Sequence, residues 1–125
     1  MAHGHFIWNE LVTHDVEKAK RFYAAALGWT YESVPAANGA TYWLIKLGQQ
    51  RIGGMFPLEG PEYANVPEGW LPYIDVDDVD ERVKKAQAGG AKLMRPIFDI
   101  PNIGRVALLT EPGGAGIAWM TPKGM

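Results

Sequence analysis

The 125-residue sequence contains no cysteine, which excludes disulfide bonds, a thiol nucleophile, an iron–sulfur cluster and a thiolate metal site. It has no basic run, and a formal net charge of -2 gives no long-range attraction for nucleic acid or anionic membranes. No apolar run approaches a membrane span, and the N-terminus lacks the basic start and apolar core of a signal peptide. We therefore expect a soluble, cytoplasmic protein with no nucleic-acid or membrane partner.

The composition is otherwise that of an ordinary globular protein, with 47% hydrophobic and 21% charged residues. A chain of this length is expected to fold as one domain over residues 1–125. Five Trp and five Met are more than a minimal core of this size requires. Some of them are therefore candidates for lining a ligand pocket rather than only filling the core.

Two stretches of the sequence resemble each other, Trp8–Lys20 and Leu71–Val83. In each, a strand-like run ends in an acidic turn and a helical pattern follows. Such an internal repeat predicts two half-size units that share one core, with ligand sites where they meet. The units are expected over about residues 4–57 and 69–122, with an aperiodic linker rich in Pro and Glu between them.

Both repeats show the order strand, helix, and then three strands. In the first, the expected elements are a strand at 6–12, a helix at 16–27 capped by Asp15 and Gly28, and strands at 29–34, 41–47 and 51–56, with a hairpin turn at 37–39. In the second, they are a strand at 70–76, a helix at 78–88, a short strand from 92, a loop at 99–104, and strands at 105–110 and 115–121. Alternation along the first strand puts four residues on one face: Phe6, Trp8, Glu10 and Val12.

An ordered set of motifs resembles the vicinal oxygen chelate superfamily, which includes glyoxalase I, bleomycin-resistance proteins and extradiol dioxygenases. The matching segments are Asp15–Tyr23, Leu27–Trp29, Asp77–Asp80, Gly89–Ala91 and Leu109–Ala115. The resemblance implies an α+β fold in which two repeated βαβββ units form cupped mixed sheets with the helices outside. It also implies a homodimer. It does not fix the function, because the superfamily hosts lyases, isomerases, dioxygenases and drug-binding proteins.

Metal-dependent members of that superfamily place four ligands in the cup. By the resemblance, these positions fall on Trp8, Leu71, Ala118 and the neighbourhood of Gly53–Met55. None of them offers the imidazole or carboxylate that a divalent ion requires. We therefore expect neither a metal nor another cofactor.

The three histidines do not supply a substitute site. His3 and His5 share a strand face opposite to that of Glu10, and His14 lies in the turn before the first helix. All three are expected to be solvated.

The cup is instead expected to be a pocket for one or two aromatic rings. Its predicted frame is Trp8, Glu10, Met55, Tyr73 and Trp119. A carboxylate in a half-buried strand is costly unless it is paired or used. Two interpretations of Glu10 remain open: contact with a ligand, or an internal ion pair with one of three cations, Lys46, Arg51 or Arg105. Asp75 is expected to be a strand-end charge or a partner of Arg105.

Three functions are compatible with this pattern. The first is a metal-free protein that binds a small aromatic or amphipathic molecule and sequesters it or confers resistance to it. The second is a lyase or isomerase, similar to lactoylglutathione lyase, that acts on a small carbonyl compound with Glu10 as general base and either an atypical metal or none. The third is a structural or regulatory dimer whose cup is filled by its own side chains.

Overall fold

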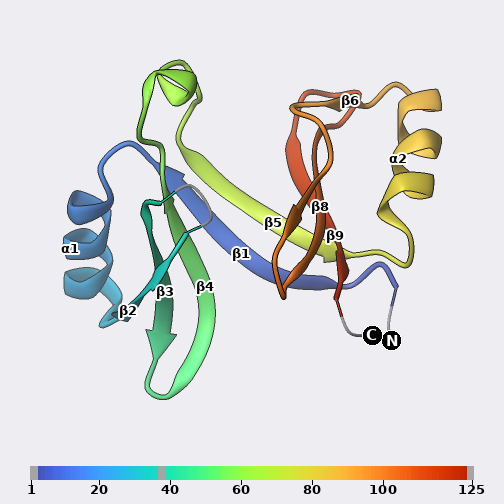
Figure 1. Ribbon diagram of the computed structural model, residues 1–125. Coiled ribbons are helices and arrows are strands. Elements are labelled where there is room, and N and C mark those ends of the chain that lie inside the picture. The colour runs from blue at the N-terminus through green and yellow to red at the C-terminus, as the bar shows by residue number, and fades with distance from the viewer. Residues whose placement is uncertain (1–2, 37–38, 124–125) are drawn as a thin grey trace. The chain divides into compact units, whose positions relative to one another are not determined.

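The computed structural model describes residues 3–36 and 39–123 (Figure 1). The chain divides into two compact units. Residues 8–70 form the first unit, and the described parts of residues 1–7 and 71–125 form the second. Residues 3–7 therefore group with the second unit, although the sequence pattern assigns them to the first repeat. No helix in the described ranges is long and apolar enough to cross a membrane.

The first unit is a four-stranded mixed sheet with one helix on it (Figure 1). Its elements are β1 (Phe6–Thr13, from Trp8 onward), α1 (Val16–Leu27), β2 (Thr30–Pro35), β3 (Thr41–Leu47), β4 (Gln50–Pro57) and a short 3-10 helix, η1 (Pro61–Tyr63). The strand order is β2-β3-β4-β1, and only the pairing of β1 with β4 is parallel. Two residues of the predicted hairpin turn, Ala37 and Asn38, lie outside the described residues.

Local chemistry explains the limits of α1. The side chain of Asp15 accepts a hydrogen bond from the backbone N–H of Lys18, and Gly28 ends the helix in the left-handed conformation at φ 75°. The inner face of the helix packs on a core formed by Leu11, Ile45 and Met55. The sheet face that carries Leu11 is therefore the one that α1 covers.

The second unit repeats this topology. Its elements are β5 (Gly69–Asp75, from Leu71 onward), α2 (Val79–Ala88), β6 (Lys92–Leu93), β7 (Phe98–Ile100), β8 (Gly104–Thr110) and β9 (Gly116–Pro122). The order is β5-β9-β8-β6, with β7 also on β8, and the pairing of β5 with β9 is parallel. The predicted α+β fold built from a repeated βαβββ unit is confirmed.

One element differs from the sequence prediction. Residues 98–100, expected to lead into and begin a loop, form strand β7, in which Phe98 pairs with Val106 and Ile100 with Gly104. A strand of three residues is too short to show a period of two, so sequence periodicity could not reveal it. The linker between the repeats likewise contains the single turn η1.

Candidate functional site

Two predicted site residues, Trp8 and Glu10, lie on the face of the first unit's sheet that α1 does not cover. Their alternate neighbour Leu11 packs under the helix, so Trp8 and Glu10 point to the other side. We call this side the helix-free face. Glu10 is buried, with 9% of its surface exposed.

A tyrosine links these two residues. The hydroxyl of Tyr42 donates a hydrogen bond of 2.9 Å to Oε1 of Glu10 and accepts one of 3.0 Å from Nε1 of Trp8. We call this arrangement the Tyr42 bridge. Of the cations that sequence reasoning offered as partners for Glu10, Arg51 instead binds both carboxylate oxygens of Glu32 at 3.1 Å.

The backbone explains how Tyr42 reaches Glu10 from a strand that is not its neighbour. Strand β4 lies between β3 and β1, and its Gly54 pairs with Glu10 on one side and Leu44 on the other. A Cβ at residue 54 would overlap the phenol ring of Tyr42, so the ring lies directly over this glycine. Sequence reasoning missed Tyr42, and no local signal identifies it, because the contact depends on the register of three strands.

Two other predicted pocket residues belong to the opposite, helix-covered faces. Met55 pairs with Leu11 in the parallel register and is fully buried in the core under α1. Trp119 pairs with Ile74, and both pack against the core beneath α2. Each of these two residues therefore lies on the helix-covered face of its own sheet, and not on the helix-free face where the pocket was expected.

Tyr73 lies on the other side of its sheet from Trp119. It is 8% exposed and pairs in register with Ala118, so it points away from the face on which Ile74 and Trp119 meet the core. Tyr73 thus lies on the helix-free face of its own sheet, as Trp8 and Glu10 do on the sheet of the first unit. That Trp8, Glu10 and Tyr73 frame one pocket stays a prediction.

The residues at the superfamily's ligand positions do not fit a metal. The Trp8 indole is a donor already bonded to Tyr42, and Ala118 is a fully buried methyl group. Within residues 3–36 and 39–123, no group of three or more His, Cys, Asp or Glu side chains could hold a metal ion.

A hollow of about 330 Å³ lies on the helix side of the first unit. Its lining includes Asn9, Ile45, Trp29 and Trp70. The two Trp rings meet edge to face at 6.1 Å, and Tyr23 stacks on Trp29 at 4.8 Å. This aromatic cluster consolidates the end of α1 against the sheet.

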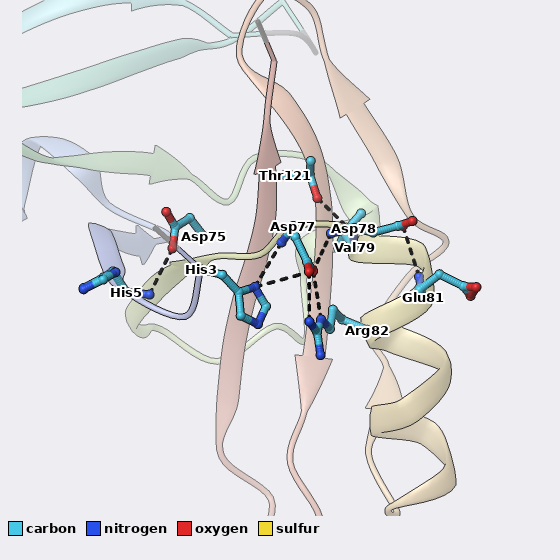
Figure 2. A network of polar contacts seen from close by, with 9 residues as sticks. All are labelled: His3, His5, Asp75, Asp77, Asp78, Val79, Glu81, Arg82 and Thr121. Carbon is cyan, nitrogen blue, oxygen red and sulfur yellow. Dashed lines mark hydrogen bonds and ion pairs between the residues drawn. The ribbon is translucent and has the colours of Figure 1, made fainter. Parts of the chain in front are cut away.

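The second unit carries a polar network at the start of α2 (Figure 2). Nε and Nη2 of Arg82 donate to the carboxylate of Asp77 at 2.8 and 2.9 Å. These hydrogen bonds hold the pKa of Asp77 far below its ordinary value. Nδ1 of His3 accepts a hydrogen bond from the backbone N–H of Asp77 at 3.1 Å.

Asp75 is the last residue of β5, so the expectation of a strand-end charge is confirmed, whereas the alternative of a pair with Arg105 is not. Asp75 is 5% exposed and accepts a hydrogen bond from the backbone N–H of His5, so it does not pair with Arg105. Arg105 binds Asp80 and Asp99 instead, and this pairing raises the pKa of its guanidinium.

All three histidines are exposed, as expected, and two of them also have protein partners. His3 contacts Asp77, as described above, and a ring nitrogen of His14 lies 2.7 Å from the carbonyl oxygen of Val66. The backbone N–H of His14 also donates to Glu68. Both histidines therefore serve to hold chain segments together.

Solved structures of known proteins share this fold. A hypothetical protein, BH1468, from Bacillus halodurans superimposes with a TM-score of 0.69 at 14% identity, covering 98% of this chain and 96% of that one. A methylmalonyl-CoA epimerase in complex with methylmalonyl-CoA and NH4+ superimposes with a TM-score of 0.64 at 14% identity, covering 98% and 97%. At such identity the likeness concerns the fold alone.

Sequence relatives are more similar. The chain is 38% identical over 119 residues to a Mycobacterium bovis protein named "Putative glyoxylase CFP32", covering 95% of this chain and 44% of that protein. It is 27% identical over 122 residues to the anthracycline biosynthesis protein DnrV of Streptomyces peucetius, covering 89% and 44%. The chain thus spans less than half the length of these relatives. Residues 4–119 match the family model, and the chain belongs to the Glyoxalase/Bleomycin resistance protein/Dioxygenase superfamily.

Proposed function

We propose that the protein binds a small aromatic or amphipathic molecule on the helix-free face of the first unit, beside Trp8 and Glu10. The observation that carries this proposal is the Tyr42 bridge, which holds an indole, a phenol and a buried carboxylate together on one sheet face. Filling a core requires no carboxylate, and burying one is costly. An apolar surface with a few converging polar groups is typical of small-molecule sites.

The chemistry of this face defines the ligand. The Trp8 ring offers a flat apolar surface, and the Glu10 carboxylate offers only acceptor oxygens. A ligand that fits both has an aromatic ring and a hydroxyl or amine that donates to Glu10. The relative named for anthracycline biosynthesis, and bleomycin resistance in the family's name, support sequestration or processing of such a compound.

Proton transfer by Glu10 is the alternative function, and the Tyr42 bridge also favours it. A carboxylate held in one orientation can take a proton from an acidic C–H, leaving the electron pair delocalised onto the adjacent carbonyl as an enolate. Return of the proton would complete an isomerisation. The epimerase of similar fold holds methylmalonyl-CoA, a carbonyl compound, which supports this alternative. Such chemistry also requires a group that stabilises the enolate oxygen.

Ligand binding is tested by a thermal-shift screen of aromatic amines and phenols in the presence of EDTA, followed by calorimetry of the compounds that stabilise the protein. Replacing Glu10 by Gln should weaken binding about tenfold, because Gln keeps an acceptor oxygen, and a hydrogen bond to a charged group contributes about 1–1.5 kcal/mol more than one to a neutral group. Glu17→Gln, at an exposed helix position, is the matched control and should leave affinity unchanged. The proposal would be contradicted if no compound bound, or if Glu10→Gln and Glu17→Gln bound a compound with equal affinity.

Proton transfer has a separate readout. Small α-hydroxy carbonyl compounds and acyl thioesters are incubated with the protein in D2O, and deuterium at the α-carbon is followed by NMR. Exchange that is lost in Glu10→Gln would establish the alternative function. Binding without exchange would favour sequestration.

A further inference from the structure

A cleft of about 440 Å³ lies on the α2 side of the second unit. It is on a different sheet face from the Tyr42 bridge and on a different unit, so it is separate from the site proposed above. Its lining combines an apolar floor from β5 and β9, two cationic side chains from α2, and residues 3 and 4 of the N-terminal segment.

The floor of the cleft includes an indole ring. Trp119 and Ile74 pair across β9 and β5, on the face that meets the core beneath α2. Trp119 is partly exposed, so part of its ring packs on the core and the rest borders the cleft. A partly exposed indole beside an aliphatic side chain is a surface on which another aromatic ring stacks.

Positive charge comes from one side of α2. Arg82 and Lys85 are one helical turn apart and both line the cleft. Arg82 already binds Asp77 through Nε and Nη2. The ammonium group of Lys85 has no hydrogen-bond or ion-pair partner among residues 3–36 and 39–123. By contrast, its neighbour Lys84, which does not line the cleft, pairs with Glu81 at 3.1 Å.

The N-terminal wall is held in place by hydrogen bonds. The backbone N–H groups of Gly4 and His5 donate to Asp75, at 2.7 Å to its carbonyl and 2.9 Å to its carboxylate. His3 is held in turn by the N–H of Asp77 (Figure 2). The wall is therefore built before any ligand arrives, which lowers the entropic cost of binding.

We infer that this cleft binds a small aromatic carboxylate. The ring lies on Trp119 and Ile74, and the carboxylate pairs with the ammonium group of Lys85. The Nη1 group of Arg82, which Asp77 does not use, is a second donor. Because Asp77 offsets the charge of Arg82, Lys85 is the residue on which affinity for the anion depends.

The test uses 1-naphthoate as the probe and 1-naphthalenemethanol, which has the same rings and no charge, as its neutral counterpart. Each is titrated into ¹⁵N-labelled protein, and the indole N–H signal of Trp119 is identified by its loss in Trp119→Phe. We expect naphthoate to shift this signal and the alcohol to bind about tenfold more weakly. Added salt should weaken the binding of naphthoate, as for any partly exposed ion pair.

Charge variants locate the contact. Lys85→Glu and the milder Lys85→Met should each weaken naphthoate binding about tenfold or more, whereas Lys84→Glu should leave it within about twofold. Circular dichroism checks that the variants remain folded. Equal losses in the Lys84 and Lys85 variants, or equal affinity for naphthoate and the alcohol, would overturn the inference. So would a Trp119 signal that does not move. Glu10→Gln should have no effect on naphthoate binding. The test of this cleft is therefore independent of the test of the helix-free face.

Discussion

The hydroxyl of Tyr42 and the carboxylate of Glu10 are 2.9 Å apart, although their strands are separated by a third. Adjacent strands are about 4.8 Å apart, so the two side chains and their hydrogen bond together span roughly twice that distance. It can do so because Gly54, on the strand between, has no side chain in its way. The positions of the glycine, the tyrosine and the carboxylate therefore depend on one another, and a substitution at any of them should displace the other two.

Gly54→Ala should displace the Tyr42 ring and break its hydrogen bond to Glu10. Overpacking of this kind lowers the free energy of unfolding by about 1–3 kcal/mol. The measurement is urea denaturation, with ligand binding on the helix-free face as a second readout. Gly113→Ala is the control, because a Cβ there meets no atom within 4 Å. A Gly54→Ala variant as stable as this control would show that the ring is not held over the glycine.

Tyr42→Phe removes the hydroxyl that both Trp8 and Glu10 contact. Leaving buried polar groups without that partner should cost about 1–3 kcal/mol of stability. Tyr63→Phe is the matched control, since the Tyr63 hydroxyl makes no hydrogen bond to residues 3–36 or 39–123, and its loss should cost less than about 0.5 kcal/mol. Similar unfolding midpoints for the two variants would contradict a role for the Tyr42 bridge in stability.

The contact between Asp77 and Arg82 predicts a pH dependence. The pKa of Asp77 is lowered in the folded state, chiefly by hydrogen bonds from Arg82, so the carboxylate stabilises the fold at pH values above its unfolded pKa. That contribution is lost as pH falls from about 4 toward the lower folded value. Asp77→Asn should therefore be less stable than the wild type at pH 7, with a gap that shrinks below about pH 4. Because the pair is exposed, the gap should also shrink with added salt. The measurement is denaturation of both proteins at several pH values. A difference in unfolding free energy that stayed constant with pH would refute the prediction.

Elements with a strong local signal were predictable from the sequence. The helix over residues 16–27 has the predicted bounds, because its apolar spacing, the Asp15 cap and the Gly28 stop all act within a few residues. The repeat likewise predicted the order of the helix and strands along the chain in each unit. By contrast, strand β7 carries too few residues for a periodic pattern to show.

Which face a strand residue occupies was harder to predict. The phase of β1 is fixed by its own alternation, so Trp8 and Glu10 were correctly placed together. For Met55 and Trp119 the phase depends on pairing with Leu11 and Ile74, and a shift of one residue moves a side chain to the opposite face. Tyr42 was missed for the same reason, since three strands must be in register before it meets Glu10.

The most direct test of the proposed site is the indole N–H signal of Trp8 in a ¹H–¹⁵N spectrum, because this group donates to Tyr42 next to Glu10. The signal is identified by its loss in Trp8→Phe, and compounds that stabilise the protein in the thermal screen are then titrated. We expect at least one of them to shift the Trp8 signal in wild type, with affinity about tenfold weaker in Glu10→Gln. If every stabilising compound left the Trp8 signal unmoved, the helix-free face would not be the ligand site.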